Sequence, residues 1–128
     1  MTRAEVGLTV THRRYVSYEH AHYAGNLVDG AYSLAAFGDV ATEMCIRTDG
    51  DEGLFASYSE VQFRSPVRAG DVVEARATLV RVGRRSREID FALVVVARGD
   101  AAAASASAAR ILAEPILATT AVGTVVVP

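Results

Sequence analysis

Apolar and polar residues alternate along several stretches of the chain, and this pattern predicts its strands. Val6 to Tyr15 alternates loosely and contains two β-branched threonines, so we expect a first strand there. Three further segments alternate with the period of a half-buried strand: Leu54 to Arg64, Asp71 to Val82 and Arg87 to Arg98. A last β-branched segment, Pro115 to Val127, predicts a fifth strand.

Between the first and second of these strands, a polar loop leads into a segment of helical length. We expect one helix from about Gly30 to Arg47, with Asp29 at the N-cap position. The TDGDEG sequence that follows is typical of a turn. The segment is apolar almost all round, which predicts a buried helix rather than one lying on the surface.

The order of a strand, a long buried helix and four further strands predicts an α+β protein. In it, an antiparallel five-stranded sheet wraps around one long helix, which is the hotdog arrangement. Residues 1–128 are expected to form a single domain, in which GDAAAASASAAR makes a flexible Ala-rich insertion, as a loop or a short helix, at about 99–110. A sheet over one helix leaves surface to bury, so we expect at least a homodimer with active sites between subunits.

Composition and charge narrow the classes of function. The net charge of -2 gives no support to nucleic-acid binding. Cys45 is the only cysteine, so neither a disulfide framework nor a thiolate metal site is expected, and the cytoplasm is the expected location. The chain has neither an apolar signal core nor an apolar run long enough to span a bilayer, so we expect it to be neither secreted nor membrane-bound.

Three polar residues of the predicted helix fall near one stripe: Tyr32, Asp39 and Glu43. In an apolar setting, desolvation and like charge should raise the pKa of one of the two carboxyls. This would leave a protonated acid beside a base, as proton transfer next to a carbonyl requires. The alternative is that one or both carboxylates pair with an arginine of a neighbouring strand.

The loop before the helix concentrates groups that handle protons or donate hydrogen bonds: His20, His22, Tyr23, Asn26 and Asp29. The two histidines lack a third ligand at a recognised spacing, so no metal is predicted. His22 is a candidate acid, base or substrate-positioning group, and the alternative is a satisfied loop histidine. Asp29 is expected to act as a helix cap or loop organiser rather than as a catalyst.

Two further features can bind an anion or a carbonyl oxygen. The backbone N–H groups of Gly30 and Ala31 lie at the helix start, where unpaired donors and partial positive charge concentrate. Arg84, Arg85 and Arg87 cluster at a predicted hairpin, and guanidinium groups suit phosphates. Solvated hairpin charge is the alternative for these arginines.

Four segments of the chain carry a family resemblance: AHYAGNLVDGAYSLAAFGDVATE, DGDEGLFASYSEVQFRSPVRAGD, VGRRSRE and LAEPILATTAVGTVVVP. They resemble the 3-aminobutyryl-CoA ammonia-lyases, hotdog enzymes of amino-acid fermentation whose close relatives act on β-alanyl-CoA. The similarity runs from about residue 18 to the end, and GNLVDG, FGDVATE and DGDEGLF are its most specific parts. The chain departs from the family at His20, where an acidic residue is frequent, and in its more basic hairpin; both departures bear on the acyl group.

The resemblance implies reversible loss of ammonia from a 3-aminoacyl-CoA to give an enoyl-CoA. Glu43 or Asp39 would be the base, and the other carboxylate, His22 or Asn26 would position the leaving ammonium. The remaining expected contacts are with the substrate, through Tyr23, Asn26, Asp29, Gly30, Ala31 and Tyr32, and with coenzyme A, through Arg84, Arg85 and Arg87. No cofactor is expected, because the thioester is itself the electron sink and coenzyme A is part of the substrate.

Three rival functions remain open on the sequence. A hotdog acyl-CoA thioesterase would direct water at the thioester carbon, with a carboxylate or His22 as general base. An enoyl-CoA hydratase would add water where the lyase adds ammonia. A non-catalytic acyl-CoA binding module would keep the fold but could lose the polar loop and helix residues that this chain retains.

Overall fold

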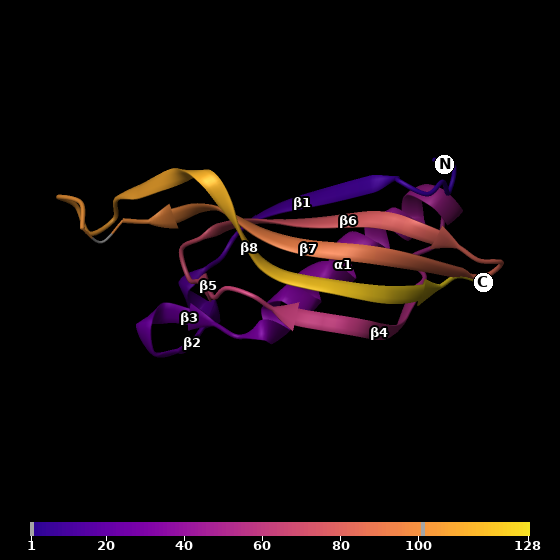
Figure 1. Cartoon of the computed structure of the whole chain (residues 1–128), viewed down its shortest axis with the longest axis horizontal. Helices are drawn as coiled ribbons and strands as arrows, with labels where there is room; N and C mark the ends of the chain where they lie inside the picture. Colours follow the sequence, from indigo (N-terminus) through magenta and orange to yellow (C-terminus); the bar gives the residue numbers. More distant parts are fainter. Residues whose placement is uncertain (1, 101) are drawn as a thin grey trace.

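The computed structural model describes residues 2–100 and 102–128, and it has one sheet curved around one helix (Figure 1). Across these residues the large sheet has five antiparallel strands in the order β1-β6-β7-β8-β4, and a small sheet has the order β2-β3-β5. The large sheet and its helix comprise β1 (Thr9–Tyr15), α1 (Gly30–Asp49), β4 (Leu54–Phe63), β6 (Val72–Val82), β7 (Ser86–Gly99) and β8 (Ala109–Val126). The predicted α+β arrangement is confirmed.

The core lies between α1 and the inner face of the sheet. On β7, the inward residues Ile89, Phe91 and Leu93 are buried, while Asp90 between them is exposed. The ring of Phe37 on α1 stacks on Phe91 with 4.9 Å between centroids. The period-two alternation of β7 therefore positions the helix, because only one face of the strand offers apolar surface to it.

The prediction that α1 is buried all round is wrong. Its sheet-facing residues are buried, but Ala31, Ala35 and Ile46 on the outward side are exposed. The helix also continues past the predicted end to Asp49. It stops there because Gly50 adopts the left-handed conformation (φ 63°) and donates its N–H to the carbonyl of Ile46 at 3.0 Å.

The loop before α1 contains structure that the sequence pattern did not predict. It holds the 3-10 turns η1 (Tyr18–His20) and η2 (Ala24–Asn26) and the short strands β2 (Ala21–Tyr23) and β3 (Leu27–Val28). β3 also pairs with β5 (Val67–Arg68), which lies in the connection after β4. These two- and three-residue strands are too short for an alternating pattern, yet they hold the loop beside the start of α1 (Figure 1).

The C-terminal hairpin extends further than its sequence predicts. β8 begins at Ala109 rather than at Pro115, and its first residues pair with the end of β7, Arg98 opposite Arg110. The predicted insertion at 99–110 is therefore strand at both ends, with a turn between them; Ala101 lies outside the described residues. Pro115 fits into β8 because the register of the β7–β8 pair shifts there, where a missing N–H is tolerated.

Within residues 2–100 and 102–128, no helix combines the length and the apolar character needed to cross a membrane.

Candidate active site

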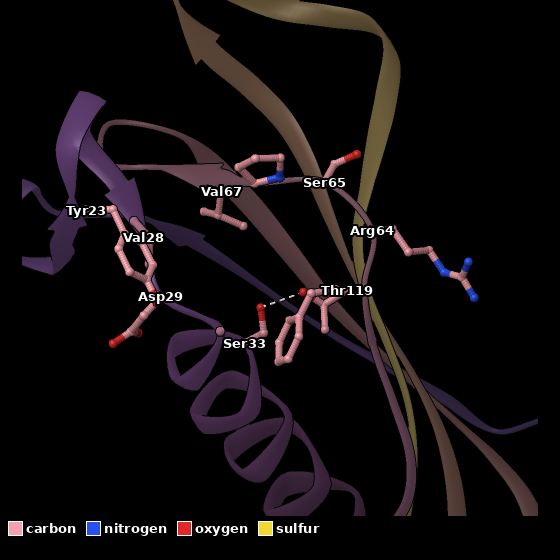
Figure 2. Close-up of a pocket in the computed structure, with 11 residues that line it drawn as sticks. Tyr23, Val28, Asp29, Ser33, Arg64, Ser65, Val67 and Thr119 are labelled. Carbon is pink, nitrogen blue, oxygen red and sulfur yellow. Dashed lines mark hydrogen bonds between the residues drawn. The ribbon is translucent and has the colours of Figure 1, made fainter.

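A cavity of about 390 Å³ opens at the N-terminal end of α1 (Figure 2). Residues from the preceding loop, the first turn of α1, the connection after β4 and the middle of β8 line it. They are Tyr23, Val28, Asp29, Gly30, Ser33, Phe63, Arg64, Ser65, Pro66, Val67 and Thr119. Three segments that are distant in sequence, residues 23–33, 63–67 and 119, thus meet where the helix begins.

Gly30, the first helical residue, lines the cavity and supplies it with a backbone donor. Its N–H and that of Ala31 have no intrahelical acceptor, although Ala31 is not among the residues that line the cavity. A Cβ at position 30 would lie 2.4 Å from Cε1 of Phe63, so a side chain there would require this ring to move. The glycine therefore lets an aromatic ring approach the helix start, where the N–H groups carry the partial positive charge of the helix.

Asp29 occupies the predicted N-cap position of α1, but its side chain does not cap the helix. Its side chain makes no capping hydrogen bond within the described chain, although its backbone has the extended conformation of an N-cap residue. The nearest basic group is His22, whose Nδ1 lies 3.7 Å from Oδ2 of Asp29. A carboxylate that lines the cavity and is not engaged by the helix is free to act on a bound molecule.

Two buried hydroxyls lie deeper in the cavity. Ser33 is near the start of α1 and Thr119 is on β8, each 2% exposed, and their oxygens are 2.8 Å apart. Neither was predicted from the sequence, because serine and threonine are common in helices and strands and their contact joins residues that are 86 positions apart. No local pattern identifies such a pair.

The two helix carboxylates are ion-paired and lie away from the cavity. Glu43 accepts hydrogen bonds from Nε2 of His12 at 2.9 Å and from Arg47 at 2.6 Å, and Asp39 pairs with Arg14. Measured along the helix axis from Gly30, Asp39 lies about 14 Å away and Glu43 about 20 Å away.

The prediction that a helix carboxyl has a raised pKa is wrong for Glu43. The hydrogen bond from His12, followed by the contact with Arg47, lowers the pKa of the Glu43 carboxyl. Pairing with an arginine of a neighbouring strand, the alternative left open by the sequence, is the arrangement of Asp39. Glu43 pairs instead with His12 of β1 and with Arg47 of its own helix.

The predicted loop residues are divided between the cavity and its surroundings. Tyr23 lines the cavity, and the ring of His22 packs edge-on against it with centroids 4.6 Å apart. Tyr32 packs instead against His20, with centroids 4.8 Å apart. Asn26, in the left-handed region with φ 61°, lines a separate hollow beside Arg68, so the structure does not support its predicted contact with the leaving group.

The predicted coenzyme A arginines lie at the opposite end of α1 from the cavity. Arg87 is only 7% exposed and donates to Asp49 at 2.8 Å and to the carbonyls of Gly83 and Ser86 at 3.0 and 2.8 Å. It is a structural residue, which corrects its predicted role. Arg84 and Arg85 are exposed on the β6–β7 turn.

Arg64 is a cavity residue that was not predicted from the sequence. It follows β4, lines the cavity, and donates from Nε to Oγ1 of Thr120 at 3.0 Å. The signal was the FRSPVR sequence, in which two arginines flank a serine and a proline in a short connection between strands. This signal is weak, because the same residues are typical of an ordinary turn.

Among the described residues, no group of three or more histidine, cysteine, aspartate or glutamate side chains is arranged to hold a metal ion. The chemistry available at the cavity is that of backbone donors, one carboxylate, one nearby imidazole, one guanidinium and the hydroxyls of Tyr23, Ser33, Ser65 and Thr119. This set can polarise a carbonyl and move a proton beside it.

Comparison with known proteins gives consistent matches. Residues 25–102 match the Thioesterase superfamily. The 3-aminobutyryl-CoA ammonia lyase of Acetoanaerobium sticklandii is 47% identical over 115 residues, which cover 88% of this chain and 89% of that protein. The structure of β-alanyl-CoA:ammonia lyase from Clostridium propionicum superimposes with a TM-score of 0.89 at 35% identity, covering 96% of this chain and 87% of that one.

A more distant structure agrees on the fold. A hexameric hotdog fold thioesterase of Campylobacter jejuni superimposes with a TM-score of 0.74 at 21% identity, covering 91% of this chain and 80% of that one. The predicted hotdog fold is confirmed.

Proposed function

Because the chain belongs to the Thioesterase superfamily and, within it, to the 3-aminobutyryl-CoA ammonia-lyases, we propose that it reversibly eliminates ammonia from a 3-aminoacyl-CoA to give an enoyl-CoA. The observation that carries the proposal is the cavity at the start of α1, which is lined both by Asp29 and by Gly30, the residue whose N–H has no intrahelical acceptor. The resemblance noted in the sequence is confirmed by identity over most of the chain.

The N–H groups of Gly30 and Ala31 would hold the thioester oxygen. Negative charge develops on this oxygen when a proton leaves the α-carbon, and preorganised donors stabilise it in a site that excludes water. The thioester is the electron sink, so the proposed reaction needs no cofactor beyond the coenzyme A of its substrate.

Asp29 is the base that the geometry favours, in place of Asp39 or Glu43. Its carboxylate lines the cavity, whereas those two are paired with Arg14, His12 and Arg47. Asp29 would take the α-proton, and the electron pair left on the α-carbon would form the double bond as the C–N bond breaks. His22, at 3.7 Å, is placed to stabilise the Asp29 carboxylate.

We further propose that the protein is at least a dimer, with β4 at the interface. In the described chain β4 pairs with β8 along one edge, and its other edge is unpaired, with Leu54 and Phe63 exposed at its two ends. The outward apolar face of α1 is a second surface that a partner would cover.

Antiparallel pairing of two β4 strands would bring the predicted arginines back to the site. Arg85 lies beside Leu54, because its carbonyl accepts from Val127, which follows the partner of Leu54 in β8. Across a two-fold axis the Leu54 end of one β4 meets the Phe63 end of the other, next to the cavity. Arg84 and Arg85 would then serve the coenzyme A of the opposite subunit, together with Arg64.

The cytoplasm is the location we propose. The single cysteine, Cys45, is a free, buried thiol, which is consistent with a reducing compartment, and the proposed substrate is a coenzyme A thioester.

The proposal is tested with purified protein, crotonyl-CoA and acrylyl-CoA, each with and without ammonium. We expect ammonium-dependent loss of the enoyl-thioester absorbance and a product whose mass is that of the 3-aminoacyl-CoA. Release of free coenzyme A would instead identify a thioesterase, and a 3-hydroxyacyl-CoA formed without ammonium would identify a hydratase. No reaction with either thioester would contradict the proposed activity.

A further inference from the structure

The hydroxyls of Ser33 and Thr119 form the polar part of the cavity floor. Both side chains are almost wholly buried, and their hydrogen bond crosses from α1 to β8 (Figure 2). Apolar residues surround them, among them Val28, Phe63 and Val67. Figure 2 shows Arg64 and Ser65 pointing away from the pair, so these two residues are not its partners.

The pair has more acceptors than donors left over. Two hydroxyls carry two O–H donors and four lone pairs, and the bond between them uses one of each. Within residues 2–100 and 102–128 the two oxygens make no other hydrogen bond. One donor and three acceptor positions therefore remain in a buried site, where unmade hydrogen bonds are costly.

The position of the pair matches one part of the proposed substrate. Ser33 follows Gly30 by three residues, so their Cα atoms lie about 4.5 Å apart along the helix axis, and the Ser33 side chain leans back toward the helix start. Both residues line the same cavity, and the β-nitrogen of a 3-aminoacyl thioester is only three bonds from the carbonyl carbon. A substrate bound at Gly30 would thus extend its β-substituent toward the hydroxyl pair.

We propose that Ser33 and Thr119 bind the β-amino nitrogen; this inference rests on the proposed lyase function. Ammonia that directs its only lone pair at the β-carbon has three N–H groups to donate. The three acceptor positions that remain on the hydroxyl pair can accept them.

The chemical step balances with the residues named. In the elimination, Asp29 takes the α-proton, the enolate electron pair forms the α,β double bond, and the C–N bond breaks with its electrons going to nitrogen. The β-ammonium group thereby leaves as ammonia, held by the two hydroxyls. The proton on Asp29 then passes to ammonia, which departs as ammonium and regenerates the carboxylate.

The test is the double variant Ser33→Ala with Thr119→Val, assayed in the direction of ammonia addition to the enoyl-CoA that the wild type uses. We expect the KM for ammonium to rise at least about 10-fold, because the acceptors are lost, while the KM for the enoyl-CoA changes less than about 3-fold.

Controls separate this role from a structural one. Removing both partners leaves no orphaned buried group, so the double variant should fold with a Tm close to that of the wild type. Thr119→Ser keeps the hydroxyl and should keep the wild-type KM for ammonium. Thr124→Val, on the same strand but facing away from the helix, should change neither KM. If the double variant does not fold, Ser33→Ala alone carries the test, with an expected rise of about 3-fold.

The outcomes distinguish the two proposals. If the wild type adds ammonia and the double variant has an unchanged KM for ammonium, this inference is wrong and the proposed function stands. The inference is also wrong if both KM values rise together, because the pair would then only shape the cavity. If the wild type adds no ammonia at all, the proposed function fails and this inference fails with it.

Discussion

The two ends of α1 differ in how far their polar groups are satisfied. At the C-terminal end, Gly50 caps the helix and Asp49 is paired with the buried guanidinium of Arg87. At the N-terminal end, the side chain of Asp29 makes no capping bond within the described chain, and the first N–H groups face a cavity. Because an uncapped helix end costs free energy, its retention beside a cavity points to binding at that end and to structure at the other.

The strongest test of this comparison replaces the carboxylate of Asp29 at the helix start and, separately, the paired carboxylate of Asp39 in the middle of the helix. We expect Asp29→Asn to lower kcat by about 10²- to 10⁴-fold, the usual loss for a general base, with little change in stability. Asp39→Asn, the matched control, removes an ion pair with Arg14 and should leave kcat within about 3-fold of the wild type. Steady-state kinetics and thermal denaturation of both variants provide the measurements. A large loss in Asp39→Asn with an active Asp29→Asn would reverse the assignment and restore the sequence-based choice of base.

At the C-terminal end of α1, a substitution should change the free energy of unfolding rather than the rate of the reaction. Arg87→Met leaves Asp49 without its partner near the end of α1, and we expect a loss of about 3 kcal/mol in the free energy of unfolding, the lower end for a broken buried pair. We expect the smaller loss because Nε of Arg87 has no hydrogen-bond partner among the described residues, so the guanidinium is not fully satisfied in the wild type. Urea denaturation measures the effect.

Arg84→Met is the control for that variant, since Arg84 is exposed on the same hairpin. Its free energy of unfolding should stay within about 0.5 kcal/mol of the wild type. If the two variants lost the same free energy of unfolding, Arg87 would contribute no more to stability than the exposed Arg84.

The fold was more predictable than the site, for a physical reason. Period-two alternation and an apolar segment of helical length are local patterns, and they placed all five long strands and the helix within a few residues, apart from the start of β8. β8 was misplaced because pairing with β7 overrides the weak strand preference of its alanines.

The site depends on contacts that local patterns do not encode. The loop residues, Asp29 and Gly30 among them, were predictable because an unusual density of polar groups precedes an apolar helix. Asp29 stands at the predicted N-cap position, but its side chain makes no capping hydrogen bond among the described residues. Ser33, Phe63, Arg64 and Thr119 are among the cavity residues that were not predicted. These residues reach the cavity only through tertiary packing, as the contact between Ser33 and Thr119 illustrates.

The smallest expected effect concerns Glu43, whose partner His12 is 31 residues away in β1. The folded protein lowers the pKa of Glu43 from its ordinary value of 4.5, chiefly through the hydrogen bond from His12. A carboxyl whose pKa is lower in the folded state stabilises the fold above the unfolded-state pKa, and this contribution disappears as the pH falls through the lowered value.

Glu43→Gln should therefore reduce the free energy of unfolding at neutral pH by only about 0.5 kcal/mol, since both partners are partly solvated. Below the lowered pKa the variant and the wild type should converge, because the wild-type carboxyl is then protonated as well. Urea denaturation of both proteins from about pH 3 to about pH 7 measures the difference. A difference that grows toward acid pH would mean that the pKa of Glu43 is raised, as a catalytic acid on the helix would require. The contrast between the paired carboxylates along α1 and the unpaired N–H groups at its start would then no longer hold.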